Sequence, residues 1–383
     1  MLRPSAKLLS VLVVVVLLLG TVMIARAQDP TATPSSAMSK GVLANFDAVK
    51  CYQAKTPDTP KIKSPTVKKP PYKIGISNSY IGNDWRTEMI QIARAYANLP
   101  EIKNLVSELY VVSSGMDAAA QIAIVDLMIA NGYDAIILNT ASEEAINPAV
   151  KRAHEAGIPV ISFDNVSTSP YAVRINEDQF EFGKVMAEWL VKQLNGKGNI
   201  FMITGVPGTT VDNGRNAGAH SVFDKTPGIK ILGEQPGMWA NGPAQTVMAN
   251  ALAAFPQIDG VWLQGGGPGA MKAFQDAKRP FVPMAGEAEN GFRQMAAENN
   301  IPIISVGQTP AMVAVSIKLA TDMLQGLEVP QDISVPLPIA QNPGLVEGKD
   351  YFPKVNPNMF VAFQLPQCGV LFNADEILAQ DAY

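Results

Sequence analysis

The sequence predicts an α/β fold of two lobes, each a doubly wound parallel sheet with helices on both faces. Short runs of strand length are apolar throughout, which is typical of strands buried on both sides. Segments with helical spacing lie between most of these runs, and such alternation favours parallel pairing. The number of strand–helix units after Tyr72 exceeds what one sheet usually holds, so two lobes are expected.

The predicted strands are the short apolar runs that follow one another along the chain. They cover residues 72–77, 109–113, 135–139, 159–163, 199–204, 229–233, 260–264, 281–284 and 303–306. The predicted helices end at recognisable signals, since Gly132 and Gly157 stand where two of them stop before the next strand. They include residues 117–131, 143–155, 180–194, 243–255 and 311–325.

The N-terminal residues predict export. Arg3 and Lys7 precede an apolar run over residues 8–24, and Ala25 and Ala27 stand where a signal peptidase requires small residues. This pattern indicates a secretory signal over residues 1–27, cleaved after Ala27. An uncleaved membrane tether is the alternative, because the apolar run is near the lower length that spans a bilayer. The protein is therefore expected in the periplasm or at the cell surface.

The stretch 28–71 is rich in Pro, Thr, Ser and Lys, and is predicted to be a spacer with one short structured patch around Cys51. Cys51 and Cys368 are the two cysteines of the chain, and in an oxidising compartment a disulfide between them is expected. A zinc site is not expected, because the chain has just two cysteines and two histidines, His154 and His220, which are far apart in the sequence. No metal is therefore expected.

Composition argues against nucleic acid as a partner. The 383 residues are 47% hydrophobic and 17% charged, and the formal net charge is −4. Removal of residues 1–27 takes away three basic residues and leaves 27 basic against 34 acidic, or −7. A nucleic-acid-binding domain needs a basic surface, which this balance does not favour.

Polar residues follow two predicted strands at the point where each ends. Asp164 and Asn165 come after the run 159–163, and Gln308 comes shortly after the run 303–306. In open α/β sheets the ligand crevice lies outside the carboxyl ends of the strands. These side chains therefore predict a small-molecule site.

Nine short motifs occur in a fixed order between Tyr72 and Gly326. They are KIGIS (73–77), GNDWR (82–86), YDAIIL (133–138), GIPVISFD (157–164), NED (176–178), GRNAG (214–218), PQIDGVW (256–262), GE (286–287) and GQTP (307–310). In this order they resemble the exported sugar-binding proteins of ABC importers, the ribose/galactose type of the periplasmic binding proteins. The resemblance covers most of the chain after residue 72.

The resemblance implies two lobes joined by a three-crossover hinge, with crossings near Asn176, Gln308 and Leu337. The N-terminal lobe would be residues 72–176 plus 309–336, and the C-terminal lobe 177–308 plus 337–383. It also implies a monomer without a cofactor, which traps a sugar or polyol between the lobes and delivers it to the membrane subunits of an importer.

Eight residues are the candidates for ligand binding, because sugars need groups that hydrogen-bond to hydroxyls and flat rings that face C–H groups. They are Asn83, Trp85, Arg86, Asp164, Arg215, Trp239, Glu287 and Gln308. Five of them have a plainer alternative: a helix cap for Asn83 and Asp164, a surface position for Arg215, and core packing for Trp85 and Trp239. Glu287 stands where the family usually has Asp.

The segment Gly265–Gly269 replaces an Asn-Asp pair of the family. Two alternatives follow: the ligand is larger, or backbone N–H groups at the helix start bind it there. Read alone, Gly265 to Ala270 fits G-x-G-x-x-A and, with Glu287 downstream, suggests a dinucleotide-binding oxidoreductase. The candidate functions also include a sugar sensor for chemotaxis or signalling, a hydrolase and a DNA-binding regulator. The sequence has neither G-x-S-x-G nor HExxH, and its N-terminus holds a signal and spacer instead of a helix-turn-helix.

Overall fold

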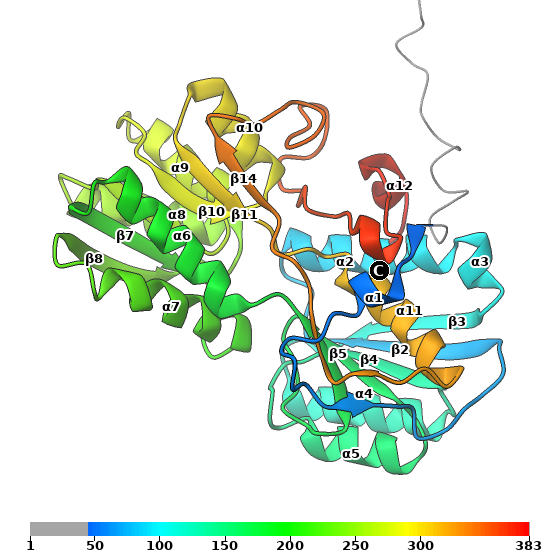
Figure 1. Ribbon diagram of the computed structural model, residues 1–383. Coiled ribbons are helices and arrows are strands. Elements are labelled where there is room, and N and C mark those ends of the chain that lie inside the picture. Colours follow the sequence, from blue (N-terminus) through cyan, green and yellow to red (C-terminus); the bar gives the residue numbers. More distant parts are fainter. Residues whose placement is uncertain (1–44, 383) are drawn as a thin grey trace, which may run out of the picture. The chain divides into compact units, whose positions relative to one another are not determined.

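The computed structural model describes residues 45–382 of the chain. It contains two six-stranded sheets, each with helices on both faces (Figure 1). The first sheet has the order β13-β6-β5-β4-β2-β3, and all its pairs are parallel. Its strands are β2 (Tyr72–Asn78), β3 (Val106–Ser113), β4 (Ala135–Asn139), β5 (Val160–Phe163), β6 (Ala172–Asn176) and β13 (Asp332–Ser334).

The second sheet has the order β14-β11-β10-β9-β7-β8. Its pairs are parallel except that the edge strand β14 runs antiparallel to β11. Its strands are β7 (Gly198–Thr204), β8 (Ile229–Pro236), β9 (Gly260–Leu263), β10 (Met284–Glu287), β11 (Ile303–Val306) and β14 (Ile339–Asn342). The predicted α/β fold with two doubly wound lobes is confirmed.

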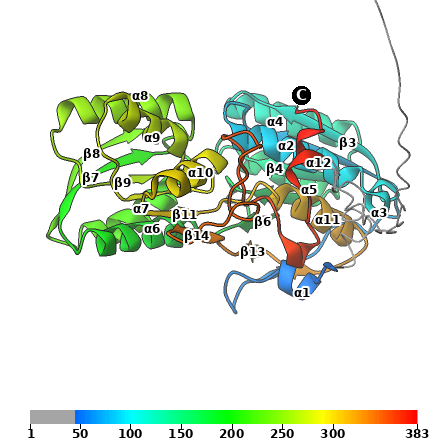
Figure 2. The same ribbon diagram turned by 90° about the horizontal axis from the view of Figure 1, so that it is seen from above.

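The helices form a layer on each face of each sheet (Figures 1 and 2). In the first lobe these are α2 (Asp84–Ala97) and α11 (Met312–Leu324) on one face, and α4 (Ala118–Ala130) and α5 (Asn147–Glu155) on the other, with the short α3 (Pro100–Lys103) after α2. In the second lobe they are α6 (Gln179–Gln193) and α7 (Thr210–Phe223) on one face, and α8 (Asn241–Ala254), α9 (Gly267–Asp276) and α10 (Asn290–Asn299) on the other.

The chain passes between the two sheets three times before Asn342. Asn176 ends β6 of the first sheet, and α6 of the second lobe follows. Gln308 follows β11 of the second sheet and precedes α11, which packs on the first lobe. Leu337 lies between β13 of the first sheet and β14 of the second. These connections bring the carboxyl ends of strands from both sheets to one region.

The C-terminal stretch departs from the expected assignment of residues 337–383 to the second lobe. β14 joins the second sheet, but from Met359 the chain packs on the first lobe, where α12 (Ala374–Leu378) lies against α2. Figure 1 shows this stretch, in orange to red, between β14 and α12. Apolar side chains such as Phe363 and Ile377 explain the difference, because they bury themselves in the core that α2 and α11 form.

The N-terminal segment of the described residues is more regular than a spacer. It forms α1 (Ala48–Cys51) and β1 (Lys61–Ile62), which pairs antiparallel with β12 (Val329–Pro330) of the first lobe. Lys68 forms a 2.7 Å ion pair with Asp134. The segment is too short to bury a hydrophobic core of its own, but its backbone forms hydrogen bonds with β12 of the first lobe.

The predicted disulfide between Cys51 and Cys368 is present, with Cα atoms 4.9 Å apart. It joins α1 to the turn η3 (Pro366–Cys368). The predicted signal, residues 1–27, and residues 28–44 of the predicted spacer lie outside the described residues. Within residues 45–382, no helix is long and apolar enough to cross a membrane. In the same range, no group of His, Cys, Asp or Glu side chains is placed to hold a metal ion.

Candidate ligand-binding site

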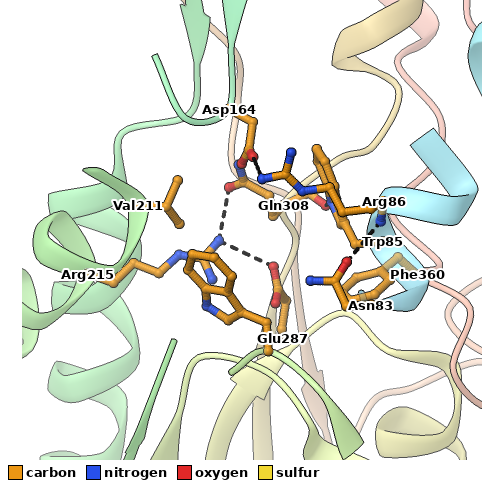
Figure 3. Close-up of a pocket in the computed structure, with 10 residues that line it drawn as sticks. Asn83, Trp85, Arg86, Asp164, Val211, Arg215, Glu287, Gln308 and Phe360 are labelled. Carbon is orange, nitrogen blue, oxygen red and sulfur yellow. Dashed lines mark hydrogen bonds and ion pairs between the residues drawn. The ribbon is translucent and has the colours of Figure 1, made fainter. Parts of the chain in front are cut away.

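A cavity lies between the two lobes, where strands of both sheets end (Figure 3). It holds about 310 Å³ of space free of protein atoms, a value that includes space open to solvent. Ten residues line it: Asn83, Trp85, Arg86, Asp164, Val211, Arg215, Trp239, Glu287, Gln308 and Phe360. The structure therefore brings together all eight residues selected from the sequence; that they bind a ligand stays a prediction.

The start of α2 supplies three of these residues. Asn83 caps the helix, since its Oδ1 accepts a hydrogen bond from the Arg86 N–H at 3.0 Å. The cap fixes the first turn, from which the buried Trp85 and Arg86 face the cavity. The Trp85 indole N–H donates to the backbone carbonyl of Gln308 at 2.9 Å, so its ring is held against the second crossing. Asn83 is thus both a helix cap and a lining residue.

Asp164 is the acceptor on the first-lobe side, and it does not cap a helix. Its backbone has φ 58°, a left-handed conformation that Asp tolerates better than most residues. Its Oδ2 accepts hydrogen bonds from Arg86 at 3.2 Å and from Asn139 and Asn165 at 2.9 Å. Its Oδ1 accepts from Gln308 at 2.7 Å. A carboxylate offers about four lone-pair positions, so Oδ1 has a further one for a ligand hydroxyl.

Arg215 is the donor on the second-lobe side, and only 1% of its surface is exposed. Its guanidinium lies 3.7 Å from the centre of the Phe182 ring. Its Nε donates to Gln179 and its Nη1 to the carbonyl of Gln264, at 2.9 and 3.1 Å. Its Nη2 donates to Glu287 at 3.3 Å. A surface role for Arg215 is therefore ruled out by its burial.

Close contact between α6 and α7 positions Arg215. A Cβ atom on Gly183 would lie 1.9 Å from the carbonyl oxygen of Arg215, and one on Gly218 would lie 2.0 Å from that of Phe180. Both helices therefore need glycine at their crossing. Close helix packing therefore explains Gly218, the second glycine of the motif GRNAG. The same packing holds Arg215 of this motif at the cavity wall.

Glu287 ends β10 and pairs with Arg215 inside the cavity wall. Burial raises the pKa of its carboxyl to about 7, although the neighbouring Arg215 guanidinium acts in the opposite direction. The carboxyl can thus donate a hydrogen bond when protonated and accept when ionised. That versatility suits a hydroxyl, which itself donates and accepts.

Trp239 forms an aromatic wall of the second lobe. Its backbone has φ 53°, and its indole N–H donates to Gln264 Oε1 at 3.2 Å. The ring lies against Gly205, where a Cβ atom would come within 2.2 Å of the indole. Val206 and Val211 pack beside it. The residue therefore has core contacts and also lines the cavity.

Gln308 connects the polar groups of the two lobes. Its Nε2 donates to Asp164, and its Oε1 accepts from Arg215 at 3.0 Å and from Gln179 at 2.9 Å. The dashed lines of Figure 3 follow this network from Arg86 to Glu287. One amide at the second crossing thus joins the Arg86–Asp164 and Arg215–Glu287 ion pairs.

Three backbone N–H groups of the glycine segment at the start of α9 already have partners within the protein, which argues against their binding a ligand. Gly266 and Gly267 donate to the carboxylate of Glu289 at 3.2 and 2.6 Å, and Gly269 donates to Asn241. The helix N-terminus that a dinucleotide pyrophosphate would need is therefore filled by the protein's own carboxyl. This contact argues against a dinucleotide-binding oxidoreductase.

Sequence reasoning missed two lining residues, Val211 and Phe360. Val211 lies in the first turn of α7, where an apolar residue is indistinguishable from a core position. Phe360 belongs to the C-terminal stretch, and no pattern around it points to the cavity. The sequence also did not predict the role of the Glu289 carboxyl group, because its hydrogen-bond partners are backbone groups more than twenty residues earlier in the chain.

Two α/β lobes with a polar, aromatic-lined cavity between them define a bilobal solute-binding protein. The family model of the periplasmic binding protein domain matches residues 74–328. The chain belongs to this family, whose members are binding proteins rather than enzymes.

Curated relatives are similar over different lengths. A xylitol-binding protein of Mycolicibacterium smegmatis is 33% identical over 178 residues, which are 45% of this chain and 51% of the relative. The chain thus matches about half the length of that protein. A ribose import binding protein of Bacillus subtilis is 23% identical over 270 residues, 70% of this chain and 86% of the relative.

Solved structures share the fold. The crystal structure of an ABC transporter solute binding protein from Thermobispora bispora has a TM-score of 0.68 and 25% identity, and the match covers 71% of this chain and 86% of that one. A second, from Actinobacillus succinogenes with bound D-allose, has a TM-score of 0.62 and 25% identity over 70% of this chain and 97% of that one.

Proposed function

We propose that this protein is an exported solute-binding protein, which captures a sugar or polyol in the interlobe cavity and delivers it to an ABC importer. One observation carries the proposal: two buried arginine–carboxylate pairs, one on each lobe, are joined by Gln308 in a cavity that two tryptophans also line. The relatives named for xylitol and ribose support the ligand class.

The chemistry of these groups matches a polyhydroxylated ligand. Asp164 and Glu287 accept hydrogen bonds from hydroxyls, whereas Arg86 and Arg215 donate to them. Trp85 and Trp239 offer flat apolar faces to the C–H groups of a sugar ring. A ligand without hydroxyls would separate these partners and leave buried polar groups unpaired, which is unfavourable by about 1–3 kcal/mol for each group. The cavity therefore selects for hydroxylated molecules.

Binding and release follow from the two lobes. A ligand that contacts both lobes stabilises the closed arrangement more than any open one, and so shifts the population towards closure. The importer then recognises the closed pair of lobes. We infer that the protein acts as a monomer, binds no nucleic acid and returns its ligand chemically unchanged.

A ligand screen tests the proposal. Melting temperature is measured against pentoses, hexoses, polyols and nucleosides, and the best ligand is then titrated by calorimetry. Asp164→Ala and Arg215→Ala should each weaken its binding more than about tenfold, because each leaves a buried partner unpaired. Mass spectrometry of the released ligand checks that it is unchanged.

Arg152→Ala and Asp126→Ala are matched controls, since this exposed ion pair lies on α5 and α4 of the first lobe. Both should bind the ligand as the native protein does. Failure of every sugar and polyol to bind, or full affinity in both cavity variants, would show that the proposed function is wrong.

A further inference from the structure

The C-terminal strap, residues 357–361, is attached to the second lobe by its backbone. The N–H of Asn290 donates to the carbonyl of Met359 at 2.7 Å, and the N–H of Val361 donates to the carbonyl of Ala288 at 2.8 Å. Phe360 and Glu289 form a β-bridge between these two bonds. The strap therefore runs antiparallel to the connection between β10 and α10, directly after the cavity residue Glu287.

The strap is also attached to the first lobe. The backbone N–H of Phe360 donates to the Oε2 of Glu88 at 2.9 Å. Glu88 lies on α2, one turn after the cavity residues Trp85 and Arg86, and is itself buried. Three successive residues of the strap are thus bonded to elements that carry binding groups: Phe360 to the first lobe, and its neighbours Met359 and Val361 to the second.

These attachments place the ring of Phe360 at the cavity. The ring lines the cavity together with the two indoles, and 3% of the residue is exposed. In Figure 3 it lies beside Asn83 and Arg86 at the α2 side of the site. A phenyl ring has no polar atom to satisfy, so what it can offer a ligand is apolar contact with C–H groups and a limit on size.

We propose that Phe360 contacts the ligand and determines which ligands the cavity accepts. This inference rests on the proposed function and adds a specificity residue supplied by the C-terminal strap, outside residues 74–328. Because the strap is bonded on both sides, its backbone fixes the Cα atom of Phe360 next to the cavity. The ring therefore limits the size of the ligand on this side of the cavity and favours ligands with one apolar face near α2.

The test compares Phe360→Ala and Phe360→Leu with a control on the same stretch, Phe363→Ala. Phe363 is buried in the first-lobe core and packs against Phe352 at 6.4 Å between ring centres, but it does not line the cavity. Dissociation constants are measured by calorimetry for the best ligand of the screen and for its methyl glycoside or methyl ether, which is larger by one methyl group.

Phe360→Ala should weaken the best ligand about tenfold or more and weaken the methylated ligand clearly less, so that the preference between them shrinks. Phe360→Leu should lie between the native protein and Phe360→Ala. Phe363→Ala should lower the melting temperature while affinity stays within about twofold.

Unchanged affinity and unchanged preference in Phe360→Leu, with a cooperative melting transition, would overturn the inference even if Phe360→Ala did not fold. If Asp164→Ala still lost binding in that case, the proposed function would stand without it. A native protein that binds no sugar or polyol would instead overturn both.

Discussion

At the scale of single residues, one buried carboxyl group at the hinge, that of Glu177, has an unusual environment. Glu177 lies just after the first crossing, and its Oε1 accepts a hydrogen bond from the N–H of Thr309 at the second crossing, at 2.9 Å. Its Oε2 has no hydrogen-bond partner among the described residues. Burial raises the pKa of this carboxyl to about 8, against a reference value of 4.5. The protonated form is therefore the one that the folded hinge favours.

The raised pKa of Glu177 predicts how stability depends on pH. Between the unfolded value near 4.5 and the folded value near 8, the folded state holds a proton that the unfolded state has released. The free energy of unfolding should therefore fall as pH rises through this window, by at most about 1.4 kcal/mol per pH unit for this group. Thermal melts of the native protein and of Glu177→Gln between about pH 5 and pH 8 measure the difference.

Glu177→Gln should show a shallower decline, because glutamine keeps an acceptor for Thr309 and cannot ionise. Glu155→Gln is the control, since the carboxyl of Glu155 is exposed and its pKa is lowered by Lys151. Equal slopes for the native protein and Glu177→Gln would show that this carboxyl does not titrate as inferred.

At the scale of elements, the crossing of α6 and α7 depends on glycine. Gly218→Ala would place a Cβ atom 2.0 Å from the carbonyl oxygen of Phe180. The helices must then separate, so we expect a loss of about 1–3 kcal/mol in stability and weaker ligand binding through the displaced Arg215. Chemical denaturation and calorimetry measure the two effects.

Gly242→Ala is the matched control, because a Cβ atom there meets nothing within 4 Å and the residue lies in α8. Helix propensity alone should make it neutral or stabilising by up to about 1 kcal/mol. A Gly218→Ala variant as stable as Gly242→Ala would contradict the packing argument.

Elements differ in how far the sequence predicts them. The strand after Gly157 was predictable because three of its four residues are apolar and all four are buried, and Asp164 because it follows that strand. Arg215 and Glu287 were selected as binding residues because of the resemblance to the family, since no local sequence pattern distinguishes either of them from a charged surface residue. Phe360 was not predictable, because its place depends on backbone bonds to residues about 70 and 270 positions earlier.

At the scale of the whole molecule, the two lobes share the site and the chain connects them repeatedly. Trp85 and Asp164 of the first lobe both bond to Gln308, which also contacts Arg215 of the second. Such shared contacts allow one ligand to act on both lobes. On the proposed function, we expect the three crossings to absorb the change between open and closed lobes, since each consists of a few residues between elements.

Saturation with the best ligand should therefore reduce the radius of gyration measured by X-ray scattering, because closure removes solvent from between the lobes. Asp164→Ala at the same ligand concentration should show a smaller change or none. A native protein whose radius stays constant at saturation, although calorimetry shows binding, would mean that capture needs no closure.

The order of the chain also determines when the second sheet and the core of the first lobe are completed. The second sheet needs no residue after Asn342, whereas the first lobe still lacks Cys368 and Ile377 at that point. Cys51 must then remain a free thiol until a partner 317 residues later has emerged. Because the sequence holds just these two cysteines, the late partner is also the single one within the chain, and no incorrect intramolecular pairing competes with it.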